Sequence, residues 1–353
     1  GVNRQVLGPT VSNITSSLNS KACRAIQIPV RRATIMEDMI NAFADEDVLN
    51  ANLSFVMIDN RGKEEMGEDT GGISRDAYSR FWQTFYDRCS LGEDQRVPAL
   101  RNDFQVMQWQ SIARILVKGY LHVKYFPFLL SNVFITSMLF GEDAVSEDSL
   151  ITSFKQYVAN DEAQILSDIL ESNRNPDNED VINFVGRFGC RKLPNSGNIR
   201  FIFLEMAHKE LIQKPQYVAD CWAPICKQWL GLKEVGDIDM LFEKIRPTNQ
   251  KVLDLVRSPM PIENEAKKEA LNYLKRLIRG LNQQDLSSFL RFVTGSDMIC
   301  VDKIPVQFTN LDGLERRPIA HTCGAVLELP RTYQSFPELR EEFNNILHQR
   351  VGK

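Results

Sequence analysis

The sequence predicts an α+β protein, and two observations carry that prediction. Apolar residues recur with helical spacing through most of the first two thirds of the chain, most clearly from Phe104 to His122. Beyond residue 300, short apolar runs alternate with polar residues, which is typical of strands. Between these parts lies Arg246-Pro-Thr-Asn249, whose composition predicts a linker.

The first part should contain two short strands among its helices. Ile26–Val30 predicts a strand at the edge of a sheet, because Pro29 cannot donate a ladder hydrogen bond. Leu53–Ile58 is apolar and partly alternating, which predicts a second strand. Helices are expected at 36–44, 77–85, 104–122, 163–170 and 199–229, with Pro215 and Pro224 interrupting the last of them.

The second part should combine helices with strands. Glu263–Leu281 places its alanine, leucine and isoleucine residues on one face and its lysine and arginine residues on the other, which predicts an amphipathic helix. A shorter helix at Leu286–Val293 should end at Gly295. The last helix should begin at Ser335, with Glu338 in the capping-box position. Strands are expected at 304–308 and 325–329.

Composition and charge exclude several classes of protein. The chain has 42 basic and 46 acidic residues among 353, so its net charge of −4 argues against nucleic acid as a partner. The longest apolar stretch, Tyr125–Phe140, is too short and too interrupted to span a bilayer, so no membrane association is expected. Seven widely spaced cysteines predict no disulfide framework and hence a reducing compartment, the cytoplasm or the nucleus.

The residues around Cys323 form the clearest candidate for chemistry. Cys323 lies on a loop that enters the expected strand at 325–329, where a side chain can be presented to solvent. His321 and two arginines precede it, and positive neighbours favour the nucleophilic thiolate. The alternative is that Cys323 is a small buried apolar residue. His321, in an extended segment, cannot face Cys323 without a bend.

Other cysteines and glycines give weaker signals. Cys221 and Cys226, with Cys190 and His208 upstream, have poor spacing for zinc, and helix packing is the preferred interpretation. The glycine-rich segment Gly67–Gly72 lacks the Gly-Lys-Ser/Thr ending of a phosphate-binding loop. Neither a metal nor a nucleotide cofactor is therefore expected.

Three segments, taken in order, resemble the HECT-type ubiquitin ligases. Arg317–Cys323, followed by Leu327-Glu-Leu-Pro330 and Tyr333, resembles the Ala-His-Thr-Cys loop, strand and final helix of that family. Leu290–Ser296 is similar to the family's Phe-Val-Thr-Gly helix end. Gly67–Arg75 resembles its Asp-x-Gly-Gly-Val-x-Arg turn. The sequence is similar to a divergent branch of that family.

The resemblance implies a bilobal α+β fold. Residues 1–246 would form a mainly helical N-terminal lobe, residues 247–250 a hinge, and residues 251–353 a smaller C-terminal catalytic lobe. Within the first lobe, residues of about 141–205 would form the subdomain that binds a ubiquitin-conjugating enzyme. Docking surfaces use exposed apolar anchors, so at least one of the aromatic residues among five apolar residues there should be exposed. They are Phe184, Phe188, Ile199, Phe201 and Phe203, of which the segment 199–203 looks strand-like.

The resemblance also implies an acyl transfer reaction. Cys323 would accept ubiquitin from the conjugating enzyme as a thioester and pass it to lysines of protein substrates. Thr322 and nearby backbone amides are candidates for stabilising the oxyanion, and His321 for orienting the site. The implied partners are a ubiquitin-conjugating enzyme, ubiquitin and protein substrates.

Two other functions stay open. One is a HECT-like interaction module that has lost transfer, because Gly324 follows the cysteine and Gln349–Lys353 lacks the phenylalanine of many members. The other is a cysteine hydrolase, which needs a remote histidine as base. The candidate histidines for that role lie in no supporting motif, and they are His122, His208 and His348.

Overall fold

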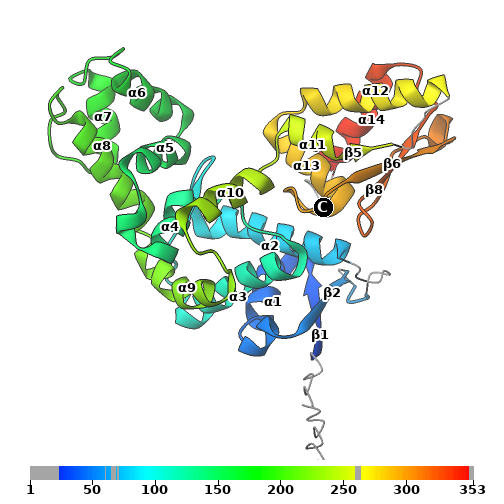
Figure 1. Cartoon of the computed structure of the whole chain (residues 1–353), viewed down its shortest axis with the longest axis horizontal. Coiled ribbons are helices and arrows are strands. Elements are labelled where there is room, and N and C mark those ends of the chain that lie inside the picture. The colour runs from blue at the N-terminus through cyan, green and yellow to red at the C-terminus, as the bar shows by residue number, and fades with distance from the viewer. Residues whose placement is uncertain (1–23, 60, 65–68, 70, 259–263, 350–353) are drawn as a thin grey trace, which may run out of the picture.

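The computed structural model describes residues 24–349 except for residues 60, 65–68, 70 and 259–263. Its architecture is α+β, as the sequence predicts (Figure 1). Buried apolar side chains of the described residues form two separate clusters. The first gathers residues between Ile28 and Ile245 together with Met298, and the second gathers residues between Val252 and Leu347.

The N-terminal part combines a small two-stranded parallel sheet with a larger set of helices. Strand β1 (Ala25–Arg31) pairs with β2 (Asn52–Ile58), and Ile28 lies opposite Phe55. Pro29 is tolerated because β1 is an edge strand, as expected. A hairpin of β3 (Ser90–Gly92) and β4 (Arg96–Pro98) follows. The helices of this part are α1 (Ile35–Ala42), α2 (Gly72–Cys89), α3 (Val106–Val123), α4 (Asn132–Phe140), α9 (Gln216–Trp229) and α10 (Val235–Ile245).

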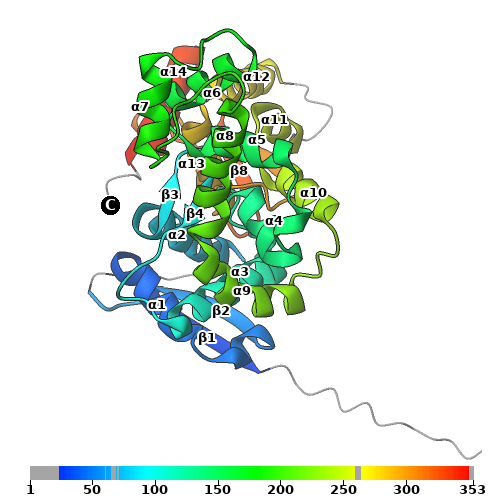
Figure 2. The same ribbon diagram turned by 90° about the vertical axis from the view of Figure 1, so that its left-hand side faces the viewer.

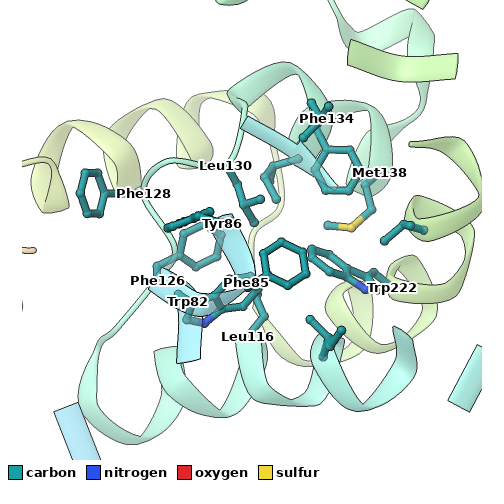
Figure 3. Packing of buried hydrophobic residues seen from close by; sticks show 14 of the residues in the cluster. Trp82, Phe85, Tyr86, Leu116, Phe126, Phe128, Leu130, Phe134, Met138 and Trp222 are labelled. Carbon is teal, nitrogen blue, oxygen red and sulfur yellow. The ribbon is translucent and has the colours of Figure 1, made fainter. Parts of the chain in front are cut away.

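Aromatic packing fixes the position of helix α2. Trp82 and Phe85 of α2 face Trp222 of α9, with ring centroids 6.2 and 6.1 Å apart, and Phe134 of α4 reaches the same ring at 5.7 Å (Figure 3). Trp82, Trp222 and Phe134 have no exposed surface. Large, fully buried rings of this kind dominate core stability. The core therefore holds α2 rigidly and, with it, the helix start at Gly72.

A group of four helices lies at one end of the molecule (Figures 1 and 2). These are α5 (Glu147–Tyr157), α6 (Asn160–Leu170), α7 (Glu179–Arg187) and α8 (Ile199–His208). A single π-helical turn, Lys209–Gln213, connects α8 to the N-terminal core. We call residues 142–208 the four-helix group. Figure 1 shows it on the opposite side of the molecule from the C-terminal part.

Two expectations about this region are wrong. The segment 199–203, which looks strand-like, begins α8, because Ile199, Ile202 and Phe203 recur at helical spacing and are buried on one face. Pro224 does not interrupt α9 but lies inside it. Its side chain is exposed, so the carbonyl that loses its helical donor can be hydrated. The expected break occurs at Pro215 alone.

The C-terminal part covers one sheet with helices. Strands β5 (Val256–Arg257), β6 (Ile304–Thr309), β8 (Val326–Pro330) and β7 (Ile319–His321) lie in that order, and only the β7–β8 pair is antiparallel. The helices are α11 (Asn249–Leu255), α12 (Glu265–Gly280), α13 (Gln283–Thr294) and α14 (Phe336–Gln349). Gly295 ends α13 in the left-handed conformation, as predicted. Glu338 accepts a hydrogen bond from the backbone of Gln334, one residue before the expected cap.

Candidate active site

Cys323 lies at the tip of a hairpin. Strand β7 pairs with β8 through His321 and Val326, and the residues between them form a turn. Two backbone hydrogen bonds close this turn, from Gly324 N–H to the His321 carbonyl (3.2 Å) and from Ala325 N–H to the Thr322 carbonyl (3.3 Å). We call residues 319–330 the Cys323 hairpin. The Cys323 side chain is exposed at its tip, so the alternative of a buried cysteine is wrong.

The other two predicted site residues lie in the same hairpin. His321 Nε2 is 2.9 Å from Glu328 Oε1 on the facing strand, so the imidazole is held by that carboxylate. Thr322 lies directly before the cysteine, and its Oγ1 faces Gly72 at the start of α2. The three predicted site residues are consecutive in the sequence, and they lie at the end of strand β7 and in the turn that follows it.

The start of α2 is built by Asp69. Its Oδ1 accepts hydrogen bonds from the backbone N–H groups of Gly71 (3.0 Å) and Ser74 (3.1 Å), and its Oδ2 from that of Phe55 (2.9 Å). The carboxylate therefore caps the helix and ties it to strand β2. The turn Gly67–Arg75, which resembles a family motif, includes residues 67, 68 and 70, which lie outside the described residues.

Arg75 joins this helix to the Cys323 hairpin. Its guanidinium donates to the carbonyl oxygens of Thr294 (2.6 Å), Thr322 (2.5 Å) and Cys323 (3.4 Å). Sequence reasoning included Arg75 in a motif but gave it no role. Only the tertiary structure brings residues more than 200 positions apart into contact.

Two glycines permit the close approach of backbone to backbone. A Cβ atom on Gly72 would lie 2.7 Å from Thr322 Oγ1 and 2.8 Å from the Cys323 nitrogen. A Cβ atom on Gly295 would lie 2.7 Å from the Gly72 carbonyl oxygen, and Gly295 also has a φ of +82°. Neither contact leaves room for a larger residue without a shift. We call this contact of α2 with Gly295 and the Cys323 hairpin the docked arrangement.

Segment Ser296–Met298 strengthens the docked arrangement. Met298 follows α13 of the C-terminal part, yet its side chain is fully buried in the N-terminal cluster. Ser79 of α2 donates a hydrogen bond to the Gly295 carbonyl (3.3 Å). The N–H of Ile299 donates to the Ile245 carbonyl (3.0 Å). The C-terminal part is therefore inserted into the N-terminal core at this segment.

Four other cysteines, Cys89, Cys221, Cys226 and Cys300, fit structural roles. Burial raises the pKa of the Cys89, Cys221, Cys226 and Cys300 thiols, which disfavours their thiolates. Among the described residues, no group of three or more histidine, cysteine or acidic side chains could hold a metal ion. In the same part of the chain, no helix is both long and apolar enough to cross a membrane.

Comparison with known proteins identifies the C-terminal part. Residues 252–350 match the family model described as a HECT-domain (ubiquitin-transferase). The matched segment contains the Cys323 hairpin and the helix end at Thr294. No curated protein matches the chain. Residues 252–350 are therefore similar to a HECT domain, which agrees with the resemblance of the motifs at residues 290–296 and 317–333, and the description of this family model gives ubiquitin transfer as its activity.

Proposed function

We propose that the chain is a ubiquitin-protein transferase that carries ubiquitin as a thioester on Cys323. The observation that supports this most directly is the exposed Cys323 at a hairpin tip inside the segment that matches the family. A nucleophile that must meet two large partners in turn needs such a position. The two alternative functions, an inactive module and a cysteine hydrolase, are distinguished from this proposal by the experiment described below.

The reaction has two balanced steps. In the first, the Cys323 thiolate attacks the carbonyl carbon of the thioester that joins ubiquitin to the conjugating enzyme, a new C–S bond forms, and the enzyme's thiolate leaves. In the second, the amine of a substrate lysine attacks the Cys323 thioester, an amide bond forms, the amine loses a proton, and Cys323 leaves as thiolate. Both steps depend mainly on proximity and orientation. We assign orientation to His321, held by Glu328, and oxyanion stabilisation to Thr322 with nearby backbone amides.

The four-helix group supports a docking site for the conjugating enzyme. Phe201 of α8 is 57% exposed, so the expectation of an exposed aromatic residue there is confirmed. Leu193 nearby in the sequence is 73% exposed. Phe201 also lines a pocket of about 560 Å³, together with Phe188 and Met206. An exposed aromatic side chain beside an apolar pocket is a favourable anchor for a protein partner.

A joint at residues 247–250 remains part of the proposal, although residues 249 and 250 belong to helix α11. The two hydrophobic clusters support it, because the first, apart from Met298, ends at Ile245 and the second begins at Val252. Movement at this joint alone would not free the C-terminal part, since Met298 is buried in the N-terminal cluster. Any swing of the Cys323 hairpin therefore requires the withdrawal of Ser296–Met298.

The test is incubation of the protein with activating enzyme, conjugating enzyme and labelled ubiquitin. A transferase forms an adduct that reductant removes, followed by modified lysines. A hydrolase releases free ubiquitin from the charged conjugating enzyme. An inactive module does neither, and that result would refute the proposal.

A further inference from the structure

We propose that Arg75 is a positioning residue for the second step, the transfer of ubiquitin from Cys323 to a lysine. The inference rests on the proposed function. Arg75 belongs to the N-terminal part, whereas the reacting sulfur belongs to the C-terminal part. Its guanidinium would hold the Cys323 hairpin against the start of α2 while the acceptor amine attacks.

The contacts of Arg75 suit such a role. One guanidinium spans the carbonyl at the end of α13 (Thr294) and two carbonyls at the hairpin tip (Thr322 and Cys323). A guanidinium presents five N–H donors in a rigid plane, so it can fix several acceptors in one geometry. Every acceptor is a backbone atom, and two of them flank the reacting residue. The contact therefore orients the backbone that carries the Cys323 sulfur.

The docked arrangement holds the hairpin without covering the sulfur. The atoms nearest to the Cβ position of Gly72 are Thr322 Oγ1, the Cys323 nitrogen and the Thr322 carbonyl carbon. The Cys323 side chain remains exposed. A contact that blocked the reaction would bury the nucleophile, whereas this one fixes its backbone and leaves its side chain accessible. The geometry thus indicates a productive state and not an inhibited one.

The position of the Cys323 hairpin indicates that the docked arrangement serves the second step, the transfer of ubiquitin to a lysine. In Figure 1, the C-terminal part and the four-helix group lie on opposite sides of the molecule. A conjugating enzyme that docks on the four-helix group is therefore held by the part of the molecule opposite the C-terminal part. The second step needs no conjugating enzyme, only an acceptor amine from solvent. Arg75 accordingly acts on the lysine transfer more strongly than on loading.

The test compares loading and discharge in single-turnover experiments. Loading is followed from conjugating enzyme that carries one labelled ubiquitin. Discharge is followed by chasing the loaded protein with free lysine. We expect Arg75→Ala to lower the discharge rate relative to the loading rate by between about tenfold and a hundredfold, the range that a small misplacement of reacting groups produces. Arg88→Ala is the matched control, because Arg88 lies on the same helix and pairs at the surface with Glu37.

Gly72→Ala supplies a second variant that keeps the arginine. The new methyl group would meet the Thr322–Cys323 backbone at less than 3 Å, so the hairpin must move away. Alanine is a better helix former than glycine, so α2 itself should persist. We expect the same selective loss of discharge. Arg75→Lys should recover part of the rate, because an ammonium group supplies a single point of attachment where the guanidinium supplies a plane.

Hydrogen exchange of residues 319–326 separates this inference from the proposed function. Without ubiquitin present, Arg75→Ala and Gly72→Ala should both accelerate exchange in this segment, whereas Arg88→Ala should not. Unchanged exchange, or an equal loss of loading and discharge, would overturn the role of Arg75 even if the wild type transfers ubiquitin. If exchange accelerates but the wild type never loads ubiquitin, the proposed function fails and the assignment of Arg75 to lysine transfer fails with it.

Discussion

Arg291 donates two hydrogen bonds of 3.2 Å, from Nε and Nη2, to the same carboxylate oxygen of Asp76, which lies 215 residues earlier in the chain. This ion pair joins α13 to α2 beside the docked arrangement. The second oxygen of Asp76 accepts from Arg80 Nε at 2.8 Å. Burial alone would raise the pKa of Asp76, but the charges of Arg291, Arg80 and Arg32 outweigh it and lower that pKa.

Asp76→Asn should therefore lower the free energy of unfolding at pH 7. A carboxylate with a lowered folded-state pKa contributes stability above its ordinary pKa of 3.8, and this stability is lost as the pH falls through the folded-state value. The deficit of the variant should shrink steadily as the pH falls below about 4. Urea unfolding of both proteins across this range measures it. A deficit that does not change with pH would contradict the account.

Asp297→Asn should have the opposite effect. Asp297 is buried, and this burial raises its pKa although Arg291 partly offsets the shift. An acid with a raised folded-state pKa destabilises the folded protein increasingly as the pH rises above the ordinary value, because the unfolded chain ionises first. The variant should gain stability relative to the wild type between pH 4 and pH 7. A relative loss over that interval would show that Asp297 is stabilised as a carboxylate.

Cys323→Ser should keep the fold and change the chemistry. The side chain is exposed, so the free energy of unfolding should change by less than about 0.5 kcal/mol. Serine can form only an oxygen ester, which base cleaves and reductant leaves intact. Gel analysis with and without reductant distinguishes the two adducts. An adduct of the variant that reductant still removes would place the nucleophile elsewhere.

Phe201→Ala should weaken loading through loss of conjugating-enzyme binding. Truncation of an exposed aromatic anchor commonly removes 1–2 kcal/mol of binding energy, so the concentration of conjugating enzyme at half-maximal loading should rise by about tenfold. Thermal stability should not fall, since the side chain is exposed. Met240→Ala is the control, because Met240 is an exposed apolar residue on α10, outside the four-helix group. Equal effects of the two substitutions would exclude a specific anchor.

Asn249→Ala should destabilise the C-terminal part. The Asn249 amide donates to the carbonyl oxygens of Ile278 (2.6 Å) and Leu281 (2.9 Å) at the end of α12. Loss of both donors should cost about 1–3 kcal/mol. Gln250→Ala is the control, because Gln250 donates to Asp254 at the surface. Denaturant unfolding of the two variants measures the difference, and an equal change in both would show that the Asn249 contacts carry no stability.

The elements that the sequence predicted well are those with strong local periodicity. Phe104–His122 and Leu286–Val293 carry helical apolar spacing, and the structure confirms α3 and α13 at these positions. The strand β7 was missed because three residues are too few for a period to show. The segment 199–203 looked like a strand but forms the start of α8. Five residues rich in apolar side chains fit both a strand and one helical turn.

The candidate site also contains some features that have a local signal in the sequence and others that depend on the tertiary structure. Cys323, His321 and Thr322 could be proposed from the sequence because they are neighbours in one motif. The contacts of Arg75 with the hairpin were not, because they join segments more than 200 residues apart. Gly72 and Gly295 belonged to recognisable motifs as well, yet only the tertiary structure shows that each glycine makes room for the other segment's backbone.

The most direct measurement for the whole account is the site of ubiquitin attachment. The wild-type protein is loaded from charged conjugating enzyme, digested without reductant and mapped by mass spectrometry. We predict that the C-terminal glycine residues of ubiquitin are linked to the peptide that contains Cys323 and that reductant releases them. Attachment to another cysteine, or no thioester on a protein that is folded, would contradict the account.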